Sequence, residues 1–153
     1  KIVLDAGFGR GDFLDYLVDM GTEPERYIGL EAIDAMADAA EQRHPGAMIL
    51  RADFIQEPVR LFVGADVVVF SGSLNTLKRP DFEKTLRVGY QAAGEALALN
   101  FLSSQRLAGA KHLTWHELKD VTRLVGELTR DYWVIDDYME GDTTIVARRP
   151  EKK

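Results

Sequence analysis

The chain has 153 residues, of which 46% are hydrophobic and 29% charged, and its formal net charge is −6 at pH 7. This composition is typical of one globular domain; it excludes a disordered chain and argues against a dedicated binder of nucleic acid or anionic membranes. Because the chain has no cysteine, a disulfide framework, a thiolate metal site and a cysteine nucleophile are also excluded.

The first half of the chain alternates short apolar runs with segments of helical periodicity. Strands are predicted at 2–4, 27–30 and 48–50 because each is a short apolar run ended by polar or glycine residues. Helices are predicted at 12–21 and 33–44, where apolar residues recur at intervals of three and four.

The second half continues the same alternation and then changes at its end. Residues 66–70 are wholly apolar after Asp66, as in a strand buried on both faces. A capping box, Thr114 to Glu117, predicts the start of a late helix. The remaining expected elements are a helix over 81–94, a strand over 96–102 and a closing hairpin of strands 132–138 and 143–147.

Repeated strand–helix units predict an α/β fold, with a mostly parallel, doubly wound sheet and helices on both faces. The closing hairpin adds an antiparallel edge. We expect one domain over residues 1–149 and a charged tail over 150–153. An eightfold α/β barrel needs ~250 residues and is excluded by length.

The most informative motif lies between the first strand and the first helix, where Gly7, Gly9 and Gly11 alternate. Glycines in such a loop let a ligand approach the backbone, and the helix start offers free N–H groups to an anion. A dinucleotide fingerprint has the spacing G-x-G-x-x-G, whereas here Asp12 stands at its last glycine. Asp5 and Asp12 would repel a pyrophosphate but suit a zwitterionic amino-acid group, and no G-K-[S/T] of a P-loop follows.

The segment VLDAGFGRGDF resembles motif I of the class I S-adenosylmethionine-dependent methyltransferases. Segments 71–75 (SGSLN) and 100–104 (NFLSS) are also similar to a small, functionally unassigned branch of that family. The resemblance implies a seven-stranded sheet of order 3-2-1-4-5-7-6 with S-adenosylmethionine as cofactor and S-adenosylhomocysteine as product. It also implies a helix before the first strand, so we expect an open pocket here and tighter cofactor binding in a longer chain.

The end of the second strand supplies a candidate ribose site. In the resembled family an acid at the position of Glu31 binds the ribose hydroxyls; the alternative is a cap for the following helix. Ala32 and Ile33 would then lie against the adenine. After the third strand, Asp53 and Phe54 match the place where the family binds adenine, through a carboxylate and the backbone; a loop cap is the alternative for Asp53.

The end of the fourth strand is expected to border the methyl acceptor. Ser71 and Gly72 would line the methionine end of the cofactor, and Asn75 is the candidate catalytic residue because its amide can orient an acceptor. A purely structural role for Asn75 in its loop is an equal alternative. The segment lacks the Asp/Asn-Pro-Pro-Tyr/Phe pattern of amino-directed nucleic-acid methyltransferases.

The predicted function is therefore methyl transfer to a small-molecule acceptor by in-line displacement, with no metal and no nucleic-acid or membrane partner. His112 and His116 form no metal-binding pattern such as H-E-x-x-H. No apolar run approaches the ~20 residues of a membrane span, and a cytoplasmic location is expected. The alternatives are a nicotinamide-dependent oxidoreductase and a non-catalytic protein that binds S-adenosylmethionine.

Overall fold

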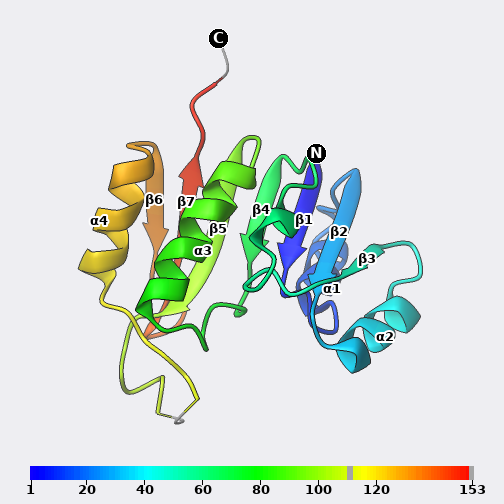
Figure 1. Cartoon of the computed structure of the whole chain (residues 1–153), viewed down its shortest axis with the longest axis horizontal. Helices are drawn as coiled ribbons and strands as arrows, with labels where there is room; N and C mark the ends of the chain where they lie inside the picture. The colour runs from blue at the N-terminus through cyan, green and yellow to red at the C-terminus, as the bar shows by residue number, and fades with distance from the viewer. Residues whose placement is uncertain (110–111, 152–153) are drawn as a thin grey trace.

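The computed structural model describes residues 1–109 and 112–151, which form strands and helices in alternation (Figure 1). The strands are β1 (Ile2–Ala6), β2 (Arg26–Glu31), β3 (Met48–Arg51), β4 (Val67–Phe70), β5 (Ala96–Leu102), β6 (Tyr132–Ile135) and β7 (Asp142–Arg148). The helices are α1 (Asp12–Asp19), α2 (Asp34–Arg43), the 3-10 turn η1 (Pro58–Leu61), α3 (Arg79–Ala92) and α4 (Leu118–Leu128).

All seven strands belong to one sheet of order β3-β2-β1-β4-β5-β7-β6. Strands β1 to β5 pair in parallel, and β7 runs antiparallel to both β5 and β6. The predicted doubly wound α/β sheet and its strand order are confirmed. The carboxyl ends of the parallel strands meet at one edge, where ligands bind in open sheets of this kind.

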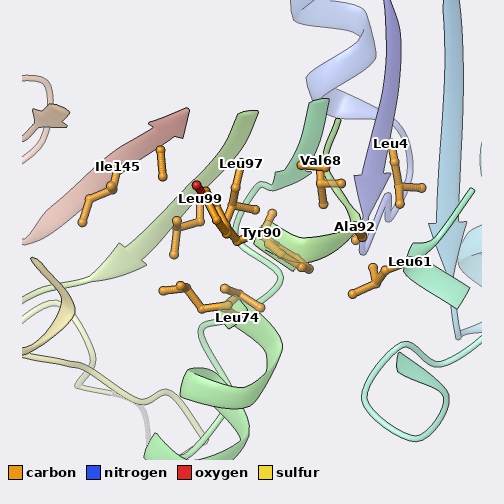
Figure 2. Close-up of a cluster of buried hydrophobic side chains, with 14 of the residues drawn as sticks. Leu4, Leu61, Val68, Leu74, Tyr90, Ala92, Leu97, Leu99 and Ile145 are labelled. Carbon is orange, nitrogen blue, oxygen red and sulfur yellow. The ribbon is translucent and has the colours of Figure 1, made fainter. Parts of the chain in front are cut away.

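The larger core lies between the sheet and the helices α3 and α4, which cover the same half of the sheet in Figure 1. Figure 2 shows Leu4, Val68, Leu97, Leu99 and Ile145 on neighbouring strands of this core, and all five are almost completely buried. Alternate residues of these strands point to this one face, and their burial holds the sheet rigid beneath the site.

A smaller core holds the start of the chain against α1 and α2. Phe8, from the glycine-rich loop, packs with Leu14, Tyr27 and Ala40. Its ring centroid lies 5.7 Å from that of Tyr27. The glycine-rich loop is thus anchored by a buried aromatic side chain that our motif analysis did not single out.

The predicted capping box at Thr114 is wrong. Helix α4 begins at Leu118, with Glu117 at its N-cap and no side-chain cap hydrogen bond. The Thr114 N–H donates to the Asn75 carbonyl at 2.8 Å, and the His116 N–H to the Leu102 carbonyl at 2.9 Å. These long-range hydrogen bonds hold residues 114–116 outside the helix, so tertiary contacts override the local capping signal.

The closing hairpin also differs from the prediction. Strand β6 ends at Ile135 rather than Tyr138, and a loop of residues 136–141 leads into β7. Gly141 in this loop has φ 85°, a left-handed value that favours glycine. The loop brings Tyr138 toward the carboxyl edge of the sheet, where its hydroxyl lies 2.8 Å from Thr144 Oγ1.

The predicted tail is described only to Glu151, since Lys152 and Lys153 lie outside the described residues. Among the described residues, no helix is both long and apolar enough to span a membrane.

Candidate functional site

The glycine-rich loop turns sharply between β1 and α1, with φ of 82° at Gly7, 59° at Gly9 and 88° at Gly11. These left-handed values are accessible to glycine at little cost. Gly7 also lies against the loop after β4, since a Cβ added to it would sit 2.3 Å from Ser73 Cβ. The Ser73 hydroxyl donates to the Ala6 carbonyl at 2.6 Å, which joins the two loops.

The start of α1 borders this loop and has no side-chain cap, because its N-cap is Gly11. Uncapped N–H groups at a helix start favour an anionic ligand group. The Asp12 carboxylate does not directly oppose the binding of an anion here, because its side chain is exposed and forms an ion pair with Arg43 at 2.7 Å.

Glu31 ends β2 and is buried, with both carboxylate oxygens engaged by backbone. Its Oε2 accepts the Gly9 N–H at 2.8 Å, and its Oε1 accepts the Ile33 N–H at 2.9 Å. A carboxylate oxygen can accept more than one hydrogen bond, so each keeps capacity for a hydroxyl donor. Glu31 therefore positions the glycine-rich loop and can still bind a diol.

The residues after Glu31 leave an apolar surface open to solvent. Ala32 is exposed, and the Ile33 side chain is 58% exposed even though it is a large hydrophobic group. A flat aromatic ring placed here would cover this surface.

Asp5 lies on β1 beneath the loop and is only 1% exposed. Its Oδ2 accepts a hydrogen bond from the Tyr27 hydroxyl at 2.6 Å. Its Oδ1 is buried and has no hydrogen-bond partner within the described residues. Burial raises the pKa of Asp5 to about 6, the Tyr27 hydrogen bond opposes this rise, and the nearby Glu31 charge adds to it.

Asp53 and Phe54 follow β3 and are used mainly by the fold. Asp53 Oδ1 accepts the Ile55 N–H at 2.8 Å and the Gln56 N–H at 3.3 Å, so it caps a turn. Phe54 is buried, with its ring centroid 5.4 Å from that of Phe70. Only the second carboxylate oxygen of Asp53 and the backbone at these positions remain for a ligand.

A groove of about 190 Å³ opens at the carboxyl ends of β4 and β5. Ser71 is one of its lining residues, and the next residue, Gly72, donates its N–H to Asn100 Oδ1 at 2.6 Å. Within residues 1–109 and 112–151, the groove's lining is mostly apolar, and its one ionisable group is a phenol. The lining residues are Phe13, Val69, Phe70, Ser71, Ala98, Leu99, Asn100, Tyr138 and Thr144.

Asn75 is placed differently from the other candidates, because it does not line this groove. Its backbone carbonyl accepts the Thr114 N–H, and its side-chain Oδ1 is buried without a hydrogen-bond partner in the described part of the chain. The structure thus brings together Asp5, Glu31 and the loops at 7–11 and 71–73, with Asn75 farther along the β4–α3 connection.

Sequence reasoning did not select Asn100, Tyr138 or Asp142 as site residues. Asn100 Nδ2 lies 3.3 and 3.4 Å from the two Asp142 oxygens, so it links β5 to the start of β7. The available signal was the place of Asn100 near the carboxyl end of a predicted parallel strand. Tyr138 and Asp142 reach the edge only through the hairpin, whose loop length the sequence did not reveal.

His116 lies on the other side of the sheet, stacked on Phe82 with ring centroids 4.0 Å apart. Burial lowers its pKa. No group of three or more His, Cys, Asp or Glu side chains suited to a metal ion is found within residues 1–109 and 112–151.

Comparison with known proteins gives a family match over most of the site. A family model described as a methyltransferase domain matches residues 3–93, more than half of the chain. No curated protein matches the sequence significantly.

Three solved structures with similar folds are distant in sequence. Magnesium protoporphyrin IX methyltransferase from Synechocystis PCC 6803, solved with bound S-adenosylhomocysteine, has a TM-score of 0.74 at 16% identity, covering 97% of this chain and 73% of that chain. A SAM-dependent methyltransferase from Archaeoglobus fulgidus has a TM-score of 0.73 at 16% identity, covering 97% and 86%. One from Clostridium acetobutylicum ATCC 824 has a TM-score of 0.71 at 10% identity, covering 96% and 83%.

Proposed function

The chain belongs to the class I S-adenosylmethionine-dependent methyltransferase family, and from this premise we propose that it methylates a small molecule bound in the groove beside the glycine-rich loop. The observation that carries this proposal is the junction of three features at the carboxyl edge of the sheet. They are the loop at 7–11, the buried acid Glu31 tied to it, and the groove that begins at Ser71.

The residues present fit the cofactor that the family uses. The unpartnered Oδ1 of Asp5 is an acceptor suited to an ammonium group, and the uncapped start of α1 suits a carboxylate. Glu31 would hold the ribose hydroxyls, and Ala32 with Ile33 would cover one side of the adenine. Asp53 would offer its remaining oxygen to the adenine amino group, with Phe54 contributing backbone only.

Bound S-adenosylmethionine would supply a methyl group on a positively charged sulfur, which is a good leaving group. The chain's own residues then have to orient the acceptor and exclude water. Phe13, Val69 and Ala98 provide an apolar surface for the acceptor. The Asn100 amide fixes the Gly72 loop beside the groove, because it accepts the Gly72 N–H at 2.6 Å.

The size and composition of the groove support a small acceptor. Its volume of about 190 Å³ lies below the roughly 300–1,000 Å³ of pockets for drug-sized ligands, so the space suits a small group. The described residues of its lining include no basic side chain, so they give no support for phosphate recognition.

The catalytic role of Asn75, orientation of the acceptor, stays a prediction within this proposal. If Asn75 orients the acceptor, Asn75→Ala should lower turnover and leave the affinity for S-adenosylhomocysteine and the melting temperature nearly unchanged. A combined loss of melting temperature and affinity would indicate that Asn75 only holds its loop against Thr114.

The proposed function is tested by thermal denaturation with S-adenosylmethionine, S-adenosylhomocysteine, NAD and NADP. A ligand that binds the native state raises the melting temperature by mass action. We expect the two S-adenosyl ligands to raise it and the nicotinamide dinucleotides to leave it unchanged. Stabilisation by NAD alone would overturn the proposal. Transfer of labelled methyl from S-adenosylmethionine to members of a small-molecule library then distinguishes an enzyme from a protein that binds without turnover.

A further inference from the structure

The groove at the carboxyl ends of β4 and β5 has an apolar interior and one carboxylate at its margin. Phe13, Val69 and Ala98 form an apolar surface. Tyr138, which is 49% exposed, adds an aromatic ring. The Tyr138 hydroxyl pairs with Thr144 Oγ1, which also lines the groove. A ligand here therefore meets two aromatic rings and a hydroxyl pair.

The carboxylate at the margin belongs to Asp142, the first residue of β7. It is half-buried and is held by the Asn100 amide, whose Nδ2 lies 3.3 and 3.4 Å from its two oxygens. Burial raises the pKa of the Tyr138 phenol, and the Asp142 charge adds to this rise. Asn100 and Thr144, which bracket this carboxylate, both line the groove.

Among the described residues, the Asp142 carboxylate forms no ion pair. No nitrogen of lysine, arginine or histidine lies within 4.0 Å of its oxygens in the part of the chain that the structure describes. The neighbouring acid Glu140, by contrast, pairs with Arg106 at 3.8 Å. Asp136 and Asp137 add further negative charge to the same loop, so the local potential favours a cation.

We propose that the groove recognises a small amine, whose apolar body lies between Phe13 and Tyr138 and whose cationic nitrogen pairs with Asp142. This inference rests on the proposed function and names the substrate class of that site. Methyl transfer to this nitrogen itself requires that it first lose a proton, because an ammonium has no free electron pair. Aromatic faces attract an ammonium through their quadrupole, and a fixed carboxylate adds a charge-assisted hydrogen bond. Asn100 acts as a positioning residue because it orients Asp142 and Gly72 at the same time.

The test uses three probes of similar shape and different charge: phenethylamine, 2-phenylethanol and phenylacetate. Binding to the full chain saturated with S-adenosylhomocysteine is measured by calorimetry, so that no turnover is required. We expect phenethylamine to bind roughly tenfold tighter than the alcohol, and phenylacetate to bind weakest. The preference for the amine should shrink as salt is added, because charge pairs at a half-open site are screened.

The matched variants are Asp142→Asn and Asp137→Asn. Asp142→Asn keeps an oxygen that accepts from Asn100 but removes the charge, so it should abolish the preference for the amine and leave affinity for the alcohol unchanged. Asp137→Asn removes an exposed acid from the same loop and should keep most of the preference. Melting temperatures of both variants, with and without S-adenosylhomocysteine, verify that fold and cofactor binding persist.

The outcomes separate this inference from the proposed function. Equal binding of the three probes, tightest binding of phenylacetate, no binding of any probe at millimolar concentration, or an unchanged preference in Asp142→Asn would overturn the inference while S-adenosylhomocysteine still binds. Failure of S-adenosylhomocysteine itself to bind would instead overturn the proposed function.

Discussion

At the end of β2, the Glu31 carboxylate accepts hydrogen bonds from the N–H groups of Gly9 and Ile33. The side chain that is proposed to bind ribose therefore also holds the glycine-rich loop in place. We predict that Glu31→Ala lowers the free energy of unfolding by about 2–3 kcal/mol, because two buried donors lose a charged acceptor. This exceeds the ~1 kcal/mol expected of a simple helix cap. Urea denaturation measures the loss, and Glu23→Ala, at an exposed position, is the control.

A second measurement separates the ribose role of Glu31 from its structural role. The affinities of the parent and of Glu31→Ala are compared for S-adenosylhomocysteine and for its 2′-deoxy analogue. We expect the parent to prefer the complete ribose, and the variant to lose that preference along with roughly 1.5–3 kcal/mol of affinity. A variant that still distinguishes the two ligands would show that Glu31 does not contact the ribose hydroxyl.

The raised pKa of Asp5 predicts that the free energy of unfolding depends on pH. Burial raises its pKa in the folded state from an ordinary value of 3.8 to about 6. The folded state therefore holds this proton more tightly than the unfolded state does, and its contribution to stability is present below about pH 4 and is lost as the pH rises through 6. Asp5→Asn keeps an acceptor for Tyr27 and removes the buried charge.

We expect Asp5→Asn to be more stable than the parent at pH 8, by up to about 3 kcal/mol, with the difference disappearing near pH 4. Its affinity for S-adenosylhomocysteine should fall at pH 8, because the partner proposed for the ammonium group has lost its charge. Urea denaturation at the two pH values and calorimetry at pH 8 measure these effects. Equal stability of both proteins across this range would show that Asp5 is not perturbed by burial.

The glycine-rich loop lies in close contact with the β4–α3 loop at Gly7 and Ser73. A side chain at Gly7 would be strained by its φ of 82° and would also meet Ser73 Cβ at 2.3 Å. Gly21 has a similar φ of 66° but no atom within 4 Å of its added Cβ. Both alanine variants should lose about 1–2 kcal/mol of stability from the left-handed backbone alone.

Only Gly7→Ala should displace the β4–α3 loop, and we predict that its affinity for S-adenosylhomocysteine falls at least roughly tenfold, or 1.4 kcal/mol. Gly21→Ala should bind as the parent does. Calorimetry on the two variants tests this pairing. Equal affinity in both would mean that contact between the loops does not shape the cofactor site.

The elements predicted well from sequence were those fixed by local chemistry. The β-branched run at 67–69 and the glycines at 7–11 specified a buried strand and a sharp turn wherever they lay in the fold. The misplaced elements were set by distant partners. Thr114 had the local pattern of a cap, but its N–H pairs with Asn75 across the fold. Asn100 in the groove and Asp142 at its margin come together through the antiparallel pairing of β5 with β7. The resemblance implied this pairing, but its register could not be read from the sequence.

Across the whole molecule, the glycine-rich loop and the end of the described chain lie at opposite edges of the sheet. The glycine-rich loop and the groove lie at the carboxyl edge of the parallel strands. The last described residues of the chain return to the other edge, beside the start of β5 (Figure 1). Arg149, the last residue of the predicted domain, is half-buried there. Its Nη1 donates to the carbonyls of Tyr90 and Gln91 at 2.9 and 3.1 Å, near the end of α3.

This arrangement predicts that the chain end contributes to stability without affecting the site. Arg149 satisfies carbonyls at a helix C-terminus and lies 5.1 Å from the Tyr90 ring centroid, so Arg149→Ala should cost about 2 kcal/mol. For a domain of this size that lowers the melting temperature by roughly 4–8 °C. Arg148→Ala is the matched control, because the adjacent side chain is exposed and its loss should change stability by less than about 0.5 kcal/mol. Affinity for S-adenosylhomocysteine should be unchanged in both variants, since the site lies at the far edge of the sheet; a loss of affinity in Arg149→Ala alone would show that the two edges are coupled.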